Sequence, residues 1–316
     1  MEKEDFIKYL ESKELKPITI DYYVRHVKIF FAKTKKEDLQ VTKPDILKFL
    51  EYLKNSRKIQ NFTRYHYLIA LNYYFTFLYE NEKIAVNPCL LLKIRGTNKK
   101  KLHKIYTPEE LDQLFDNYYQ IFIRAYDDSR HRHEAQKRYS VLYRGRNALI
   151  VSILFNQGTA TSEIETIEMD DFDLIKATIR IRGKYRRKDR ILPLKATQIG
   201  LFMNYLQNIR PLLVEYQTTE SNKLFLGLPA ISYKTTDNEM KRGVFKPITE
   251  QIKSIDKNFV NFQQIRASVI SFWIKTQGLR KAQHLAGHRC ICTTEKYVTN
   301  NLDGLIDDIN KLHPFL

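Results

Sequence analysis

The sequence predicts an α+β fold in two domains: a helical bundle, then a mixed but mainly helical domain with a small β-sheet. Three observations support this prediction. Apolar residues recur at helical spacing through residues 1–95. Residues 96–106 are polar and basic and have no apolar periodicity, as in a linker. Residues 177–194 alternate between apolar and charged side chains, which is typical of a β-hairpin.

The first domain is expected to contain four helices, because four segments each place apolar residues on one face. They span residues 2–15, 16–34, 42–55 and 61–82, before a stop at Asn87-Pro88. The residues expected to face inward are Phe6, Leu10 and Leu15, then Tyr23, Val27, Phe30 and Phe31, then Ile46, Phe49, Leu50 and Leu53, and finally Leu68, Leu71, Phe75 and Leu78. Aromatic stripes at this spacing favour a packed core over a platform for stacking bases.

A domain boundary is expected in the basic segment after the fourth helix. Thr107, Pro108 and Glu110 have the spacing of an N-cap, a first helical residue and a capping box. The prediction is therefore a first domain at residues 1–97, a basic linker at 98–106 and a second domain at 107–316. The lysines of the linker are suited to lie along a phosphate backbone.

The second domain mixes helical and strand patterns. Helices are expected at 107–126, 145–157, 197–213 and 263–279, with a solvated basic segment between the first two and a loop at 229–250. In the hairpin, Ile179 and Ile181 face one way and Arg180 and Arg182 the other, with a turn at 183–188. The tail from 301 to 316 has a single apolar stripe.

The net charge of the chain points to the class of its partner. Lys and Arg number 53 against 36 Asp and Glu, which gives a net charge of +17 in 316 residues. A folded protein this basic repels itself, and a polyanion relieves the repulsion, so nucleic acid is the expected partner. A generally basic proteome is the alternative explanation. A membrane is disfavoured, since the chain has no basic amphipathic anchor and no apolar run of roughly 18 residues.

Cysteines and histidines give no sign of a metal or cofactor site. Cys89, Cys290 and Cys292 form an odd, sparse set that matches neither a zinc site nor a disulfide framework. His131 and His133 lack acidic or cysteine partners at ligand spacing, and no glycine-rich phosphate loop is present. The N-terminal segment does not have the pattern of a signal peptide, so a reducing cytoplasm is the simplest compartment.

The stretch LAGHRCICTTEKYVTNN, residues 285–301, places Tyr297 nine positions after His288. A tyrosine that attacks a phosphodiester must lose a proton, which costs about 4 kcal/mol at pH 7 from a reference pKa of about 10. The transition state gathers negative charge that arginine can bind, and the leaving 5′-oxygen needs a proton donor such as lysine or histidine. The chemistry therefore requires Tyr, Arg, Lys and His together, and no metal.

The second domain supplies these residue types in order. Lys184 lies at the hairpin tip in GKYRRKDRILPL, and Arg266 lies at a helix start in QQIRAS. With GTATSEIETIEMDDFDL and LAGHRCICTTEKY, these segments resemble the boxes of the tyrosine recombinase (phage integrase) family, in its Xer-like two-domain form. The helical first half, ending in Asn-Pro, resembles the core-binding domain of that family. The resemblance covers nearly the whole chain, and the Gly-His to Tyr spacing is its most specific element.

The resemblance implies a C-shaped clamp of core-binding and catalytic domains around a DNA crossover site. Tyr297 would attack the scissile phosphate and form a 3′-phosphotyrosyl bond, with Lys184 as the general acid. Arg266 would bind the developing charge, and His288 would handle the proton of the nucleophile. Strands would exchange without cofactor or metal in a homotetramer on inverted-repeat core sites, with residues 301–316 docked on a neighbouring protomer. The expected function is site-specific recombination for a mobile element, as in integration or transposition, or for DNA inversion.

Two positions depart from the pattern of the family. Its first box has Gly-x-Arg-x-x-Glu, whereas this chain has Gly158, Ala160 and Glu163, so the arginine is missing. Gln263 replaces the first histidine of the second box and can still donate a hydrogen bond. Ala160 cannot bind phosphate, which leaves three explanations open: a deliberate substitution, a naturally weak enzyme, or a nearby cation that substitutes. Loss of one such donor costs about 10²–10³ in rate, so slow cleavage is expected.

Plainer interpretations stay open for each candidate. Lys184 could belong to a basic patch that follows the phosphate backbone, Arg266 could be a surface cation, and His288 could cap a helix. Glu163 is expected to support the site without taking part in the chemistry. Two other functions also stay open: a catalytically inactive DNA-binding protein, which Ala160 favours, and a type IB topoisomerase.

Overall fold

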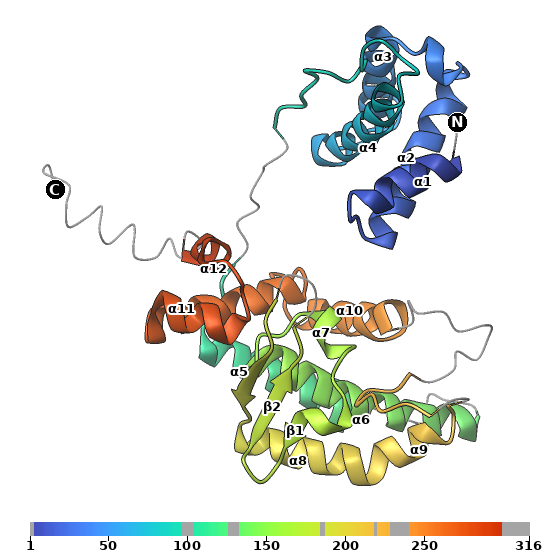
Figure 1. Cartoon of the computed structure of the whole chain (residues 1–316). Coiled ribbons are helices and arrows are strands. Elements are labelled where there is room, and N and C mark those ends of the chain that lie inside the picture. The colour runs from blue at the N-terminus through green and yellow to red at the C-terminus, as the bar shows by residue number, and fades with distance from the viewer. Residues whose placement is uncertain are drawn as a thin grey trace, which may run out of the picture. The chain divides into compact units, whose positions relative to one another are not determined.

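The computed structural model describes residues 3–96, 104–125, 133–183, 187–217, 220–227 and 240–298. The chain divides into two compact units, Met1–Lys101 and Leu102–Leu316 (Figure 1). This division falls within the predicted linker at 98–106. Three features singled out in the sequence lie outside the described residues: the hairpin tip with Lys184, His131, and the tail at 301–316.

Within residues 3–96, the first unit is mainly helical, as predicted. Its helices are α1 (Lys3–Ser12), α2 (Pro17–Thr34), α3 (Lys43–Asn55) and α4 (Asn61–Glu80), with a short 3₁₀ turn, η1 (Asp38–Gln40). The helices begin and end within three residues of the predicted bounds. Local sequence was sufficient here because each helix buries one apolar face.

The apolar faces of these four helices meet in one core rich in aromatic rings. Phe6 lies edge-on to Tyr74 with ring centroids 5.0 Å apart, and Phe30 lies edge-on to Phe49 at 5.1 Å. Burial of each such ring contributes about 1.5–3 kcal/mol to stability. Most of the residues predicted to face inward are buried, and the exceptions, which are half-buried, are Leu15, Tyr23 and Phe31. The aromatic stripes therefore build the core.

The second unit is a mixed, mainly helical domain. Its described elements, apart from the strands, are α5 (Pro108–Tyr118), η2 (Tyr119–Arg124), α6 (Glu134–Asn156), α7 (Thr161–Ile164), η4 (Met169–Asp171), α8 (Ala196–Asn204), η5 (Tyr205–Ile209), α9 (Arg210–Val214), η6 (Met240–Phe245), α10 (Lys246–Ile255), α11 (Phe262–Ala286) and α12 (Ile291–Val298). Helix α6 lies between α8 and α11 and also contacts α5 (Figure 1). At the start of α5, Glu110 N donates to Thr107 Oγ1 and Thr107 N donates to Glu110 Oε2, so the predicted capping box is confirmed.

A three-stranded antiparallel sheet packs beside these helices. Its strands are β1 (Phe172–Asp173), β2 (Thr178–Ile181) and β3 (Arg190–Pro193), in that order. Ile179 pairs with Leu192 and Ile181 pairs with Arg190, so the predicted hairpin of β2 and β3 is confirmed. Strand β1 was not predicted, because two residues are too few to show an alternating pattern.

The helix predicted at 145–157 begins earlier, because residues 134–144 of the predicted solvated basic segment already belong to α6. Arg146 is fully buried and donates to the carbonyl of Leu226 at 2.9 Å and to Asn147 Oδ1. Gly145 lies so close to α8–α9 that an added Cβ would come within 2.7 Å of the Ile209 side chain. The polar composition hid this part of the helix, because its residues contact distant parts of the chain and do not form an apolar stripe.

The loop predicted at 229–250 is wrong for residues 240–250, which belong to η6 and α10. Ile248 and Ile252 are fully buried, four positions apart on one face of α10. An apolar pair at this spacing is the usual signal of an amphipathic helix, but the helix is short and Gly243 and Pro247 suggested a turn. Pro247 fits because the first turn of a helix needs no backbone N–H donor.

Two absences concern only the described part of the chain. None of the helices there is long and apolar enough to cross a membrane. Among those residues, no three His, Cys, Asp or Glu side chains are grouped so as to hold a metal ion.

Candidate active site

A cavity of about 560 Å³ in the second unit is lined by residues of α7 and its N-cap, the segment before β3, α11, the α11–α12 turn and α12. Its lining residues are Ala160, Thr161, Ser162, Arg187, Phe262, Gln263, Arg266, His288, Thr293 and Tyr297. Five of the six candidate residues from the sequence are therefore in one place, although they are far apart along the chain. The sixth, Lys184, lies outside the described residues.

Arg266 is placed by the first turn of α11. Asn261 caps this helix, its side chain accepting from the backbone N–H of Gln263 at 2.9 Å. The Arg266 guanidinium is 3 % exposed and donates to the carbonyls of Gly158 and Ala286, at 2.5 and 2.7 Å. Burial lowers the pKa of Arg266 to about 10, so the group stays charged at pH 7. It is a fixed cation of the cavity and not a cation on the helix surface.

Glu163 is the buried carboxylate around which the cations gather. Arg190 donates to both of its oxygens, at 2.8 and 3.0 Å, and the backbone N–H of Ala160 donates at 2.8 Å. Arg187 and Arg266 approach the same carboxylate at 3.5 and 3.6 Å. Burial alone would raise the pKa of Glu163, but the hydrogen bonds and charge of Arg190 outweigh it and hold the pKa below its ordinary value. Glu163 is thus an anion that orients three guanidinium groups.

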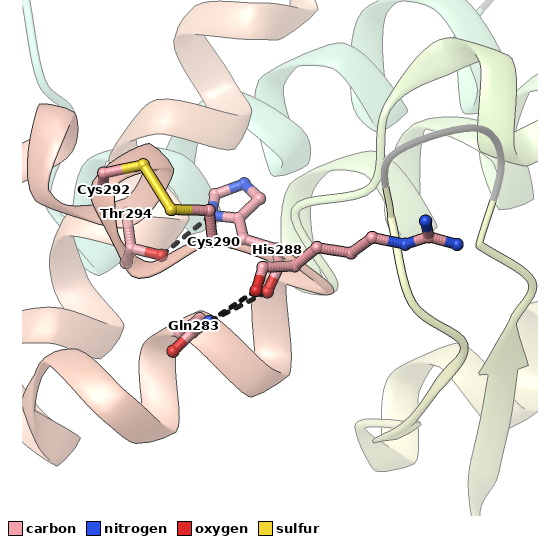
Figure 2. Close-up of a disulfide and its surroundings, with 6 residues drawn as sticks. Gln283, His288, Cys290, Cys292 and Thr294 are labelled. Carbon is pink, nitrogen blue, oxygen red and sulfur yellow. Dashed lines mark hydrogen bonds between the residues drawn. A yellow bond between two sulfur atoms is a disulfide. The ribbon is translucent and has the colours of Figure 1, made fainter.

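His288 lies in the turn that joins α11 to α12. Its Nδ1 is 2.9 Å from the hydroxyl of Thr294, and its Nε2 is 3.4 Å from Nη2 of Arg266 (Figure 2 shows the Thr294 bond). A guanidinium can only donate, so Nε2 is the acceptor and Nδ1 carries the proton. Burial, followed by the charges of Arg266 and Arg187, lowers the pKa of His288 to about 4. The imidazole is therefore neutral at pH 7 and able to accept a proton.

The position of His288 depends on close packing between the turn and the hairpin. The side chain of Gln283 donates to the carbonyls of His288 and Arg289, at 3.1 and 3.3 Å (Figure 2). Lys188 N donates to the carbonyl of Gly287 at 2.8 Å. Gly287 has a φ of +69°, and a Cβ there would come within 2.8 Å of the Lys188 carbonyl oxygen. Only glycine fits this position, both for its backbone conformation and for the space available.

The cysteine spacing indicated no disulfide framework, but one pair of cysteines is bonded. Cys290 and Cys292 are joined at the start of α12, between His288 and Tyr297 (Figure 2). Their Cα atoms are 5.4 Å apart, within the range that a disulfide can bridge. The sequence did not suggest this bond because two positions of separation is too short a loop for the frameworks that cysteine counting detects. Cys89 is free and buried in the first unit.

Tyr297 lies on α12, half-buried against the cavity. Its ring stacks on that of His288, with centroids 5.7 Å apart and planes 13° from parallel. Its backbone carbonyl accepts from the hydroxyl of Ser271 on α11 at 3.4 Å, and α11 and α12 contact each other closely. The neutral imidazole is therefore the titratable side chain whose ring stacks on the phenol ring.

Sequence reasoning missed three residues of the site, namely Arg187, Arg190 and Thr294. Arg190 did have a signal, because it is in phase with Leu192 and Leu194 on the buried face of its strand. An arginine on a buried face requires a buried carboxylate partner, and Glu163 was the available acid of a neighbouring box. Arg187 and Thr294 had no local signal.

The sequence matches two family descriptions. Residues 134–303, more than half of the chain, match the phage integrase family, and residues 3–83 match the phage integrase N-terminal SAM-like domain. A tyrosine recombinase XerC of Natranaerobius thermophilus is 26 % identical over 321 aligned positions, covering 98 % of this chain and 97 % of that protein. A tyrosine recombinase XerD of Staphylococcus saprophyticus is 28 % identical over 177 positions, covering 54 % of this chain and 55 % of its own.

Solved structures show the same fold at lower identity. The XerH site-specific recombinase bound to its difH substrate before cleavage is 20 % identical, with a TM-score of 0.65 over 97 % of this chain and 84 % of that one. The Tn1549 transposon integrase bound to transposon right-end DNA is 14 % identical, with a TM-score of 0.62 over 98 % of both chains. The chain therefore belongs to the phage integrase family of tyrosine recombinases, in the Xer-like form with an N-terminal SAM-like core-binding domain and a catalytic domain.

Proposed function

We propose that this protein is a site-specific DNA recombinase that cleaves and rejoins DNA through a 3′-phosphotyrosyl bond at Tyr297. The observation that carries the proposal is the cavity in which Tyr297, His288 and Arg266 meet. A nucleophile, a neutral base and a fixed cation are the groups that phosphoryl transfer needs. The net charge of +17 suits a DNA substrate.

The proposed cleavage step is a transesterification. The Tyr297 hydroxyl oxygen bonds to phosphorus, and the bond from phosphorus to the 5′-oxygen breaks. The phenol proton passes to a base, and the 5′-oxygen gains a proton as it leaves. Because one phosphoester replaces another, the energy of the bond is kept, and rejoining is the reverse step with a different 5′-hydroxyl.

The roles follow from the state of each group. We assign His288 as the base, because its ring is neutral at pH 7 and lies beside the ring of Tyr297. Arg266 is charged at pH 7 and is suited to bind a non-bridging oxygen of the phosphate. Gln263 also lines the cavity, and its amide can donate to the same group. Lys184 keeps the role of general acid that the resemblance of the hairpin segment implies.

The proposal extends to the biological setting that the sequence boxes suggest. The protein would act for a mobile element or an inversion system, as a homotetramer on paired inverted-repeat core sites. Residues 301–316 would dock on a neighbouring protomer, since they follow the nucleophile and have one apolar stripe.

The test is covalent capture on a nicked duplex that contains the core site, once that site has been found by selection from a DNA library. The nick lets the short strand diffuse away after cleavage, so the protein stays attached to DNA. We expect an adduct with the parent protein and none with Tyr297→Phe at equal DNA affinity. An adduct that still forms with Tyr297→Phe would remove Tyr297 as the nucleophile.

Ala160 favours a second candidate, a DNA-binding protein of the same fold without catalysis. In that case the parent would bind its site specifically and form no adduct at any time. A type IB topoisomerase would be distinguished by cleaving single sites, whereas a recombinase needs two paired sites for strand exchange.

A further inference from the structure

The cavity has an excess of positive charge. Arg187, Arg190 and Arg266 all approach Glu163, and this carboxylate carries only one negative charge. With His288 neutral, this group of side chains has a net charge of +2. Buried charge without a counter-ion is costly, so such a site favours a bound anion. A phosphodiester has one negative charge and gathers more in the transition state.

The three arginines are not equally available to that anion. Arg190 is completely buried and is committed to both oxygens of Glu163. Arg266 is nearly buried and already donates to two carbonyls. Arg187 has a side chain that is 30 % exposed, and its contact with Glu163, at 3.5 Å, is longer than that of Arg190, at 2.8 Å. Since Arg190 already satisfies the carboxylate, Arg187 can exchange that contact for a phosphate oxygen.

Arg187 also lies on the correct side of the cavity. It lines the cavity together with Ala160, Gln263 and Tyr297. Its backbone pairs with that of His288 in an isolated antiparallel bridge, which fixes its Cα beside the proposed base. At Ala160, by contrast, the backbone N–H donates to Glu163 and the side chain is a methyl group.

We propose that Arg187 binds the scissile phosphate beside Arg266 and supplies the second guanidinium that Ala160 cannot provide. This inference rests on the proposed function of the same site. Of the three explanations that the sequence left open for Ala160, the geometry favours substitution by a nearby cation. The alternative role for Arg187 is to hold Glu163 in place without touching DNA.

The test compares rates of adduct formation on the nicked duplex at saturating protein. Arg187→Gln should slow cleavage by about 10²–10³. Lys188→Gln is the matched control, since the exposed Lys188 side chain carries the same charge and does not line the cavity, and its contacts with Gly287 are made by backbone atoms that the substitution keeps. It should change the rate less than about threefold. Urea unfolding checks that both variants are folded.

Moving the guanidinium from position 187 to position 160 distinguishes the two possible roles of Arg187, binding the phosphate and holding Glu163 in place. Ala160→Arg with Arg187→Gln should recover at least about tenfold of the rate lost in Arg187→Gln, because either position can reach the phosphate. Ala160→Arg alone should raise the rate less than about tenfold, because Arg187 already supplies the second guanidinium. If Arg266 were the only guanidinium on the phosphate, the same change would raise the rate at least about tenfold. A substrate whose scissile phosphate has one oxygen replaced by methyl is neutral, and on it Arg187→Gln should lose most of its defect.

Three results would overturn the inference while leaving the proposed function in place. Arg187→Gln could be no slower than Lys188→Gln. The added arginine could fail to rescue, with the defect unchanged on the neutral substrate. The parent could form no adduct while Ala160→Arg forms one that depends on Tyr297. If neither the parent nor Ala160→Arg forms an adduct, both proposals fail.

Discussion

At the residue scale, the environment of His288 determines what this side chain can do. Its Nδ1 is bonded to Thr294, and its Nε2 faces Arg266 next to the ring of Tyr297. Burial disfavours a charged imidazole, and Arg266, Arg187 and Arg190 would also repel it, and together these causes explain why the pKa is low. Burial, together with the same cations that suit the site to a phosphate, therefore keeps the proposed base unprotonated.

This low pKa predicts a pH dependence of stability. In the unfolded chain His288 titrates near 6.5, whereas in the fold its pKa is about 4. The unfolded state therefore binds the extra proton between these values, and the free energy of unfolding falls as the pH drops through this window. Between pH 7.5 and pH 5 the loss from this group should be about 2 kcal/mol. His288→Gln cannot be protonated, so urea unfolding at the two pH values should show a smaller loss. Equal losses in both proteins would contradict the assigned shift.

At the scale of elements, three segments hold the cavity together. The hairpin of β2 and β3, the box around α7 and the turn between α11 and α12 contact one another through Glu163, Arg190 and Gly287. The turn and the hairpin approach so closely that no side chain fits at Gly287. A change at this point should therefore disturb the positions of His288 and Tyr297 together.

Gly287→Ala tests this packing. The added methyl group meets backbone at 2.8 Å in a conformation with positive φ, so we expect a loss of more than about 1 kcal/mol of stability and slower adduct formation. Gly200→Ala is the matched control, because Gly200 is an exposed position of α8 with no atom within 4 Å of an added Cβ. It should gain about 0.5–1 kcal/mol from helix propensity. Equal effects of the two changes in urea unfolding would show that the close approach does not matter.

At the scale of the whole molecule, the net charge is the property that most directly predicts DNA binding. The net charge of +17 is spread over both units, and it predicts binding to DNA through many phosphate contacts. Each neutralised phosphate contributes about −0.9 to the slope of log affinity against log salt concentration. We expect a slope steeper than about −2 in a fluorescence anisotropy titration with the core site. A shallower slope would contradict a clamp that surrounds the duplex.

The sequence determined most of the architecture because the elements have local signals. Apolar spacing gave the four helices of the first unit, and alternation gave the hairpin with Ile179 and Ile181 on its buried face. The order of the boxes also brought Ala160, Gln263, Arg266, His288 and Tyr297 forward as one candidate site, and the fold places these five around one cavity. The first half of α6 was not predicted because its side chains are buried by residues far away in the sequence. The start of α10 was not predicted because its apolar pattern is too short to recognise.

Only the tertiary structure decided how the charges of the site are shared. Arg190 reaches Glu163 across 27 positions of sequence, and Arg266 reaches the Gly158 carbonyl across 108. Arg187 is one of several cations in the hairpin segment, and its place beside Ala160 depends on how the hairpin packs on the α11–α12 turn. The physical reason is one of range. Periodicity records which face of an element is buried, whereas the partner of a buried charge is set by contacts between elements that are far apart in the chain.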